Sequence, residues 1–256
     1  LGLAAAAAIT LIVTGGAIAP IRRSFAAQRR FVAFASHELR TPAALIRANA
    51  DVIEREGLAL PAGRPLVADI IAESDRLAHL VGDLLELASI EASGLAIDAR
   101  PVDLAELASA TAREAQPLAA GRGVHVVARA DPSSVTIVGG DRNRLVQLLL
   151  ILLDNAFDHS PAGGTVTIAV RRADRNVELA VSDSGPGIPA SDRERVFEPF
   201  TGLPGGRRDR AGGTGLGLSI ARRIVSAHRG TIRVDDTRAG GGATLLVTIP
   251  ALTAAP

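Results

Sequence analysis

The stretch TVTIAVRRADRNVELAVSDSGPGIP, residues 165–189, decides the fold of this chain. Apolar and polar residues alternate in both of its halves, which is typical of strands that have one buried face. The residues expected on that face are Val166, Ile168, Val170, Val177, Leu179 and Val181. The Ala-Asp-Arg segment between the two halves predicts a β-hairpin, and a glycine-rich segment follows the second strand directly.

Regular elements are predicted on both sides of this hairpin. A helix is expected at about 103–116, short strands at 124–128 and 135–138, and a long apolar helix at 142–159. After the hairpin, a last helix at about 216–228 leads to strands at 231–234 and 243–249. This order predicts a mixed sheet with helices on one face. At ASGLAIDARPVD (92–103) the pattern changes from helical spacing alone to alternating helices and strands, which predicts a domain boundary near residue 95.

The residues before that boundary predict a helical hairpin. Helical spacing runs from about 24 to 56, GLALPAGRP (57–65) interrupts it, and a second helix follows at about 65–91. Leu77, Leu80, Leu84 and Leu87 have the alternating three-four spacing of a seam that packs on a partner helix. Pairing two hairpins in a four-helix bundle would cover both seams, so we expect a homodimer. A hairpin that packs only on its own chain is the alternative.

Composition excludes several classes of function. The formal net charge is +1 and 2% of the residues are aromatic, so the sequence offers neither a basic footprint nor stacking platforms for nucleic acid. Cysteine is absent, which excludes disulfides, thiolate metal sites and a cysteine nucleophile. Nucleic acid is therefore not an expected partner.

The first residues, 1–19, carry no charge and would span about 28 Å as a helix, close to the ~30 Å of bilayer hydrocarbon. Arg22, Arg23, Arg29 and Arg30 follow this run, whereas a secretory signal would place its positive charges before it. We expect residues 1–19 to be the whole or the later part of a transmembrane helix. The rest of the chain would then lie in the cytoplasm. An Ala-rich buried helix is the alternative.

Two polar segments are candidates for chemistry on the α/β part. Asn155 lies late on the apolar helix, where its oxygen suits Mg²⁺ shared with phosphates or else caps the helix end. Asp183 follows a strand, and its carboxylate can accept a hydrogen bond from an exocyclic amine such as that of adenine. Gly185 and Gly187 would let the chain approach a flat ligand closely. An ordinary turn is the plain alternative.

A third segment, AGGTGLGLSI (211–220), places Gly213, Gly215 and Gly217 at a helix start. Free backbone N–H groups and the helix dipole favour phosphate there. A dinucleotide-binding fold would need a strand just before these glycines, and a Walker loop would need a Lys after the last one. Neither is present in the sequence.

Taken in order, five segments resemble the conserved boxes of the bacterial sensor histidine kinases of two-component systems. They are SHELRTP (36–42), LLDNAFDHS (152–160), DSGPGIP (183–189), FEPF (197–200) and GGTGLGLSI (212–220). The resemblance runs from about residue 20 to 250. It implies a multidomain chain: a membrane helix (1–19), a linker (20–30), a dimerisation and phosphotransfer hairpin (31–94), and an ATP-binding α/β two-layer sandwich (95–256) like that of Hsp90 and gyrase.

The resemblance also implies roles for residues of the hairpin. His37 would be the phosphoacceptor, whose neutral imidazole attacks the γ-phosphoryl group of ATP, with Glu38 as general base. Thr41 would serve dephosphorylation of the partner protein. Pro42 lacks the N–H for the carbonyl of Glu38, so the helix should bend beside the imidazole.

In the ATP-binding part, the resemblance implies ATP and Mg²⁺ as cofactors. Asn155 would hold the metal, and Asp183, Gly185 and Gly187 would receive the adenine. The other implied nucleotide-site residues are Phe197, Phe200, Gly213, Thr214, Gly215, Leu216 and Gly217. A lid at about 201–214 would order on nucleotide.

The implied function is that of a homodimeric sensor kinase of the inner membrane, which passes a phosphoryl group from His37 to an Asp of a cytoplasmic response regulator. Two residues depart from the family. Ile151 stands where Asn is usual, and Asp158 stands where a basic residue is usual. A charge pair ~4 Å apart at an effective dielectric of ~20 is worth on the order of 4 kcal/mol, so Asp158 should weaken ATP binding unless it is compensated, and Asp158→Lys should raise activity.

These departures keep a second reading open: a nucleotide-impaired member that acts as a dimeric scaffold or response-regulator phosphatase. A soluble chaperone-like ATPase is a third reading, but ATP hydrolases of the Hsp90 and gyrase type carry a water-activating Glu at the place of Ile151.

Overall fold

The computed structural model describes residues 39, 43–53, 55, 63–93, 95–131, 134–201, 215–235 and 241–252. They fall into two compact units that divide within helix α2 (Arg64–Ser93), between Val81 and Gly82. None of the helices in these ranges has an apolar run long enough to cross a membrane. The expected membrane helix (1–19) and linker (20–30) lie outside the described residues.

Helix α2 confirms the second helix of the expected hairpin, and residues 43–53 are helical as well. Of the four seam leucines expected to face a partner helix, Leu80, Leu84 and Leu87 are buried within this one chain, as is Ile90, whereas Leu77 is half-buried. A second row of apolar residues on α2 is exposed instead: Val67, Ile71, Val81 and Leu85. Their steps of four, ten and four residues keep them on one side of the helix. α2 therefore has two apolar faces, one of them open.

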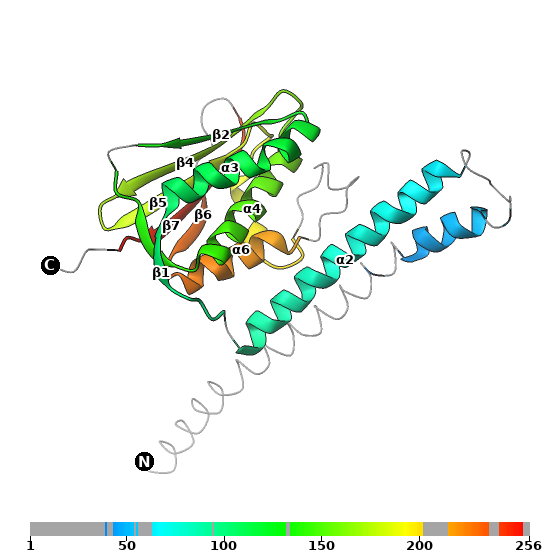
Figure 1. Cartoon of the computed structure of the whole chain (residues 1–256), viewed down its shortest axis with the longest axis horizontal. Helices are drawn as coiled ribbons and strands as arrows, with labels where there is room; N and C mark the ends of the chain where they lie inside the picture. Colours follow the sequence, from blue (N-terminus) through cyan, green and yellow to red (C-terminus); the bar gives the residue numbers. More distant parts are fainter. Residues whose placement is uncertain are drawn as a thin grey trace, which may run out of the picture. The chain divides into compact units, whose positions relative to one another are not determined.

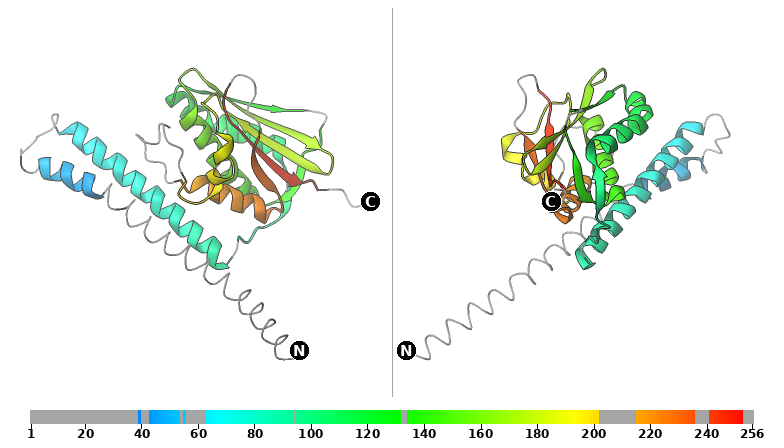
Figure 2. Two further views of the ribbon diagram at one scale, coloured as in Figure 1. Left: turned by 180° about the vertical axis from the view of Figure 1, so that it is seen from behind. Right: turned by 60° about the vertical axis from the view of Figure 1, so that its left-hand side comes forward.

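The second unit holds a five-stranded mixed sheet of order β2-β4-β5-β7-β6 and a separate two-stranded sheet, β1-β3. The strands are β1 (Arg100–Asp103), β2 (His125–Ala130), β3 (Ile137–Gly140), β4 (Thr165–Ala173), β5 (Asn176–Ser182), β6 (Thr231–Asp235) and β7 (Thr244–Pro250). The helices are α3 (Leu104–Gly121), α4 (Arg142–His159) and α6 (Gly217–Ala227), with short 3₁₀ turns η1 (Ala190–Asp192) and η2 (Arg195–Phe197). The three helices lie on one face of the five-stranded sheet (Figures 1 and 2), which confirms the predicted α/β layers.

The β4-β5 hairpin is the centre of the sheet, and its predicted alternation is confirmed. Ala173 pairs with Asn176 across a turn in which Asp174 has φ 52°. The six expected inward residues of the two strands are at most 2% exposed. Burying an aliphatic side chain of this size contributes about 1.5–3 kcal/mol, so this face holds the sheet against the helices.

Two local features differ from the sequence-based expectation. α3 continues through Pro117 to Gly121, although the helix was expected to end at Gln116. Proline removes one backbone donor, but Ala115 and Ala119 on either side of it are buried, and this packing maintains the last turns. The β1-β3 pair was not predicted, because β1 has four residues, includes Pro101 and shows no alternation of apolar residues.

The N-terminus of α4 is held by the Asp141 carboxylate. Its Oδ1 accepts hydrogen bonds from the backbone N–H groups of Asn143 (3.0 Å) and Arg144 (3.2 Å), and its Oδ2 accepts one from Asp98 (3.2 Å). The backbone N–H of Asp141 donates to Nε2 of His228 at the end of α6, so the His228 hydrogen lies on Nδ1 and is donated to the Ile224 carbonyl. Asp141 thus joins α4, α6 and the segment before β1.

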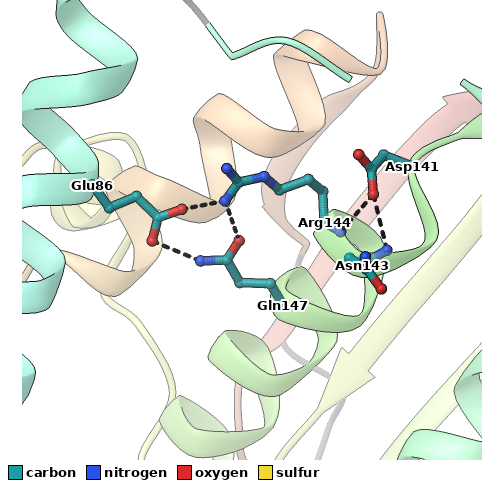
Figure 3. Close-up of polar contacts among 5 residues, drawn as sticks. All are labelled: Glu86, Asp141, Asn143, Arg144 and Gln147. Atoms are coloured by element: carbon teal, nitrogen blue, oxygen red, sulfur yellow. Dashed lines mark hydrogen bonds and ion pairs between the residues drawn. The ribbon is translucent and has the colours of Figure 1, made fainter. Parts of the chain in front are cut away.

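The same turn of α4 also binds the last part of α2, which belongs to this second unit (Figure 3). The guanidinium of Arg144 pairs with one carboxylate oxygen of Glu86, and Nε2 of Gln147 donates to the other at 2.7 Å. Arg144 Nη1 also donates to Oε1 of Gln147 at 2.9 Å. The three side chains therefore form a closed polar network between two helices.

We predict that Asp141→Ala lowers the free energy of unfolding by about 1 kcal/mol, the usual cost of losing a helix N-cap. Burial alone would raise the pKa of the Asp141 carboxyl, but hydrogen bonds from the backbone of Arg144, Asp98 and Asn143 and the charge of Arg144 hold it below 3.8. A lowered folded pKa means that the ionised group stabilises the fold above pH 3.8 and loses this contribution as the pH falls through the folded pKa.

Asp141→Asn keeps a capping oxygen and removes the charge, so its difference from the wild type in urea unfolding should be present at pH 7 and shrink as the pH falls below 3.8. Glu114→Ala, an exposed carboxylate change on α3, is the control and should be neutral. A pH-independent difference between Asp141→Asn and the wild type would contradict the role of the ionised carboxylate.

Candidate functional site

The C-terminal half of α4 brings a buried polar side chain, Asn155, to the wall of a cavity. Asn155 is 6% exposed and lines a cavity between α4, the loop after β5 and the start of α6. In the part of the chain that the structure describes, its carboxamide has no hydrogen-bond partner. The amide is therefore available to a ligand that enters the cavity.

Asp183 faces the same cavity and is fixed in place. Its Oδ1 accepts hydrogen bonds from the backbone N–H groups of Gly185 (2.7 Å) and Ala243 (2.9 Å). Only glycine fits at position 185, because the backbone there passes so close to α4 that a Cβ would lie 2.6 Å from the carbonyl oxygen of His159. Both bonds use one oxygen, so the second oxygen can accept from a ligand amine.

The cavity walls include residues that the sequence analysis missed. Besides Asn155, Asp183 and Gly187, the lining residues are His159, Pro186, Ile188, Val196, Thr201, Leu218 and Ala243. Of these, His159 had a signal in the sequence, since it lies one helical turn after Asn155 and shares its face. The cavity is about 40 Å³, below the roughly 300–1,000 Å³ of typical ligand sites, so the walls must separate before a nucleotide base enters.

The start of α6 has the features of an anion site. Leu216 is its N-cap, is fully buried and provides no side-chain cap to the helix. An N-cap without a capping side-chain bond leaves the first turn of α6 suited to an anionic ligand, since helix N-termini favour phosphate. Gly217 packs on α4, where a Cβ would come within 3.3 Å of Ile151 Cγ2. Of the expected phosphate loop, Gly213 and Thr214 lie outside the described residues.

The two Phe residues of FEPF occupy different positions. Phe197 is buried, and the guanidinium of Arg222 on α6 lies 5.8 Å from its ring centre. Phe200 has φ 66°, and its backbone N–H donates to the carbonyl of Gly215 at 3.0 Å. This hydrogen bond joins the residues on either side of the expected lid (201–214). The contact between Phe197 and Arg222 attaches the residues just before the lid to α6.

Asp158 was expected to place a negative charge near the phosphates, but it is paired with an arginine. Its carboxylate lies 3.4 Å from the guanidinium of Arg122 at the end of α3, and it is absent from the described residues that line the cavity. Arg122 thus provides the kind of compensation that the expectation for Asp158 allowed for, and the reason to expect higher activity from Asp158→Lys is removed.

A magnesium ion fits this site through one protein ligand. Asn155 offers an unpaired amide oxygen near the uncapped start of α6, and hard oxygen ligands suit Mg²⁺. No cluster of three acidic or histidine side chains exists among the described residues, so the remaining ligands would come from phosphate and water. The expected catalytic residues of the hairpin, His37, Glu38 and Thr41, lie outside the described ranges.

Comparison with known families and proteins agrees with this geometry. Residues 140–253 match the family described as histidine kinase-, DNA gyrase B- and HSP90-like ATPase, and residues 27–93 match the His Kinase A (phospho-acceptor) domain. The sensor-like histidine kinase SenX3 of Mycobacterium tuberculosis is 35% identical over 230 residues, which are 90% of this chain and 55% of SenX3. The chain thus spans about half the length of this relative.

Two solved structures resemble the chain. Full-length ShkA in complex with AMPPNP has a TM-score of 0.64 at 28% identity, covering 89% of this chain and 47% of that one. The mycobacterial sensor histidine kinase MprB has a TM-score of 0.50 at 30% identity, covering 59% of this chain and 97% of that one. On this sequence and structural similarity, the chain belongs to the sensor histidine kinase family of two-component signal transduction.

Proposed function

We propose that this chain is the kinase part of a membrane sensor histidine kinase that phosphorylates His37 with Mg-ATP. The observation that carries the proposal is the cavity beside α4, where the unpaired amide of Asn155 and the fixed carboxylate of Asp183 lie near the uncapped start of α6. An adenine, a metal and a phosphate chain need these three groups together.

The nucleotide would lie across this cavity. Its exocyclic amine would donate to the second oxygen of Asp183, and the apolar side chains of Ile188, Val196 and Leu218 would contact the faces of the base. Its phosphates would then reach the backbone N–H groups at the start of α6. Bound Mg²⁺, with Asn155 among its ligands, would neutralise phosphate charge.

The chemistry is one in-line displacement. A nitrogen of the His37 imidazole forms a bond to the γ-phosphorus, the bond from that phosphorus to the bridging oxygen breaks, and ADP leaves. Glu38 takes the ring proton, which keeps the attacking imidazole neutral. The phosphoryl group then passes from His37 to an Asp carboxylate of a response regulator, and Thr41 would take part in removing it again.

The open apolar face of α2 supports a homodimer. Val67, Ile71, Val81 and Leu85 remain exposed while the opposite face is buried, so a second copy of the hairpin would cover them in a four-helix bundle. We further propose that residues 1–19 anchor this dimer in the inner membrane, because their uncharged run has the length of a bilayer span and is followed by arginines.

Ile151 favours one second candidate, a nucleotide-impaired member that acts as a scaffold or phosphatase. Its Cγ2 lies against the first turn of α6, where an amide would have added a polar group beside the phosphates. The two candidates differ in whether the chain binds ATP at all.

We predict that the chain in detergent, incubated with Mg-ATP labelled in the γ-phosphate, takes up an acid-labile label. His37→Gln should abolish the label, because it removes the attacking nitrogen, and should leave nucleotide binding intact. His79→Gln, which changes an exposed histidine of α2, is the matched control and should keep the label. Label that survives in His37→Gln would contradict the assigned acceptor, and a wild-type chain that binds no nucleotide would favour the second candidate.

We predict that Ile71→Asp converts the dimer into monomers, because it places a charge in the apolar face that a second copy must bury. Mass photometry of the detergent-solubilised chain measures this. Leu118→Asp changes a similarly exposed residue of α3 (50% against 56% for Ile71) and should leave the dimer intact. A dimer that tolerates Ile71→Asp would show that this face of α2 is not the interface.

A further inference from the structure

The last turns of α4 carry two carboxylates that one arginine holds. Asp154 and Asp158 are four residues apart, so they lie one above the other on the helix. Nη1 of Arg122 lies 2.8 Å from Oδ1 of Asp154 and 3.4 Å from Oδ1 of Asp158. The guanidinium therefore bridges both side chains from outside α4.

Two neighbours hold Arg122 where it can pair with both carboxylates: the end of α3 and the ring of Phe157. It follows α3 directly, and its backbone N–H donates to the carbonyls of Leu118 and Ala119. Its guanidinium lies 6.0 Å from the ring centre of Phe157, which is completely buried. The end of α3 and the ring thus fix the arginine beside the same turn of α4 that carries Asn155.

The two carboxylates lie close enough to the proposed nucleotide site for their negative charge to affect the binding of a nucleotide's phosphates. Asp154 precedes Asn155, and Asp158 follows it by three residues, about 5–6 Å along the helix surface. Neither is among the described residues that line the cavity, yet both lie within one turn of the residue that would hold the metal. Without compensation, two negative charges at this distance would repel the phosphates of a nucleotide.

We propose that Arg122 is a positioning residue of the nucleotide site: it neutralises Asp154 and Asp158 and holds them away from the bound phosphates. This inference rests on the proposed function, because it concerns the affinity of the same site for ATP. It gives the chain a cation at the end of α3 in place of the basic residue that is usual at position 158.

The inference reverses the expectation for position 158. A lysine there would face Arg122, so two positive charges would meet where an ion pair now lies. Asp158→Lys should therefore leave the affinity unchanged or lower it.

The test measures the affinity of the whole chain in detergent for a fluorescent ATP analogue, at 50 mM and 500 mM salt. Arg122→Ala should weaken binding about fivefold at low salt, because it leaves two half-buried carboxylates uncompensated, and the effect should shrink at high salt. Arg122→Lys keeps the charge and should bind nearly as the wild type. Arg113→Ala removes an exposed arginine from α3 and controls for net charge.

The deciding variant is the triple change Arg122→Ala with Asp154→Asn and Asp158→Asn. Recovery of affinity in this variant supports the electrostatic role, since a merely structural arginine would not be rescued by removing its partners. Unchanged affinity in Arg122→Ala, or a loss that the triple change does not restore, overturns the inference while the proposed function stands. A wild-type chain that binds no ATP analogue overturns both.

Discussion

The burial of α4 is the constraint on which the rest of this structure depends. Six of its apolar side chains are at most 1% exposed between the sheet and the neighbouring helices: Leu145, Leu148, Leu149, Leu152, Leu153 and Phe157. Because this face fixes the rotation of the helix, it also fixes where the few polar residues point. Asn155 is brought to the cavity by the packing of its neighbours, and the Asp141 cap and the Glu86–Arg144–Gln147 network hold the other end of the same helix.

Charge compensation determines what this helix can do for a nucleotide. α4 ends in a region with three acidic or amide side chains, and an anionic ligand is favoured there only if the acids are neutralised. Arg122, directly after α3 and 6.0 Å from the ring centre of Phe157, provides the cation, and the N-cap of α6 has no capping side-chain bond. The site thus combines paired carboxylates at the end of α4 with a helix N-terminus, and helix N-termini favour anions such as phosphate.

Strong periodicity made much of the fold predictable. The β4-β5 hairpin, α4, α6 and the strands that follow it agree with the expected elements, because each combines a clear period with turn residues at its ends. Pro117 misled the prediction of α3, since tertiary packing outweighed the local signal, and β1 is too short to show a period. For the site, residue type and place in the sequence predicted Asn155 and Asp183, and the structure brings both to one cavity. The pairing of Asp158 with Arg122 joins residues 36 positions apart on different helices, and no pattern in the sequence indicates it.

The central claim is that the cavity beside α4 binds adenine. A change of the nucleotide base tests it most directly, because Asp183 is the residue assigned to recognise the exocyclic amine of that base. Binding of ATP and of inosine triphosphate, which has a carbonyl in place of the exocyclic amine, should be compared for the wild-type chain by calorimetry. A hydrogen bond to a charged group is worth about 1.5–3 kcal/mol, so ATP should bind roughly 10- to 100-fold more tightly, and Asp183→Asn should narrow that difference. Equal affinities for the two nucleotides would contradict the assignment of this cavity to adenine.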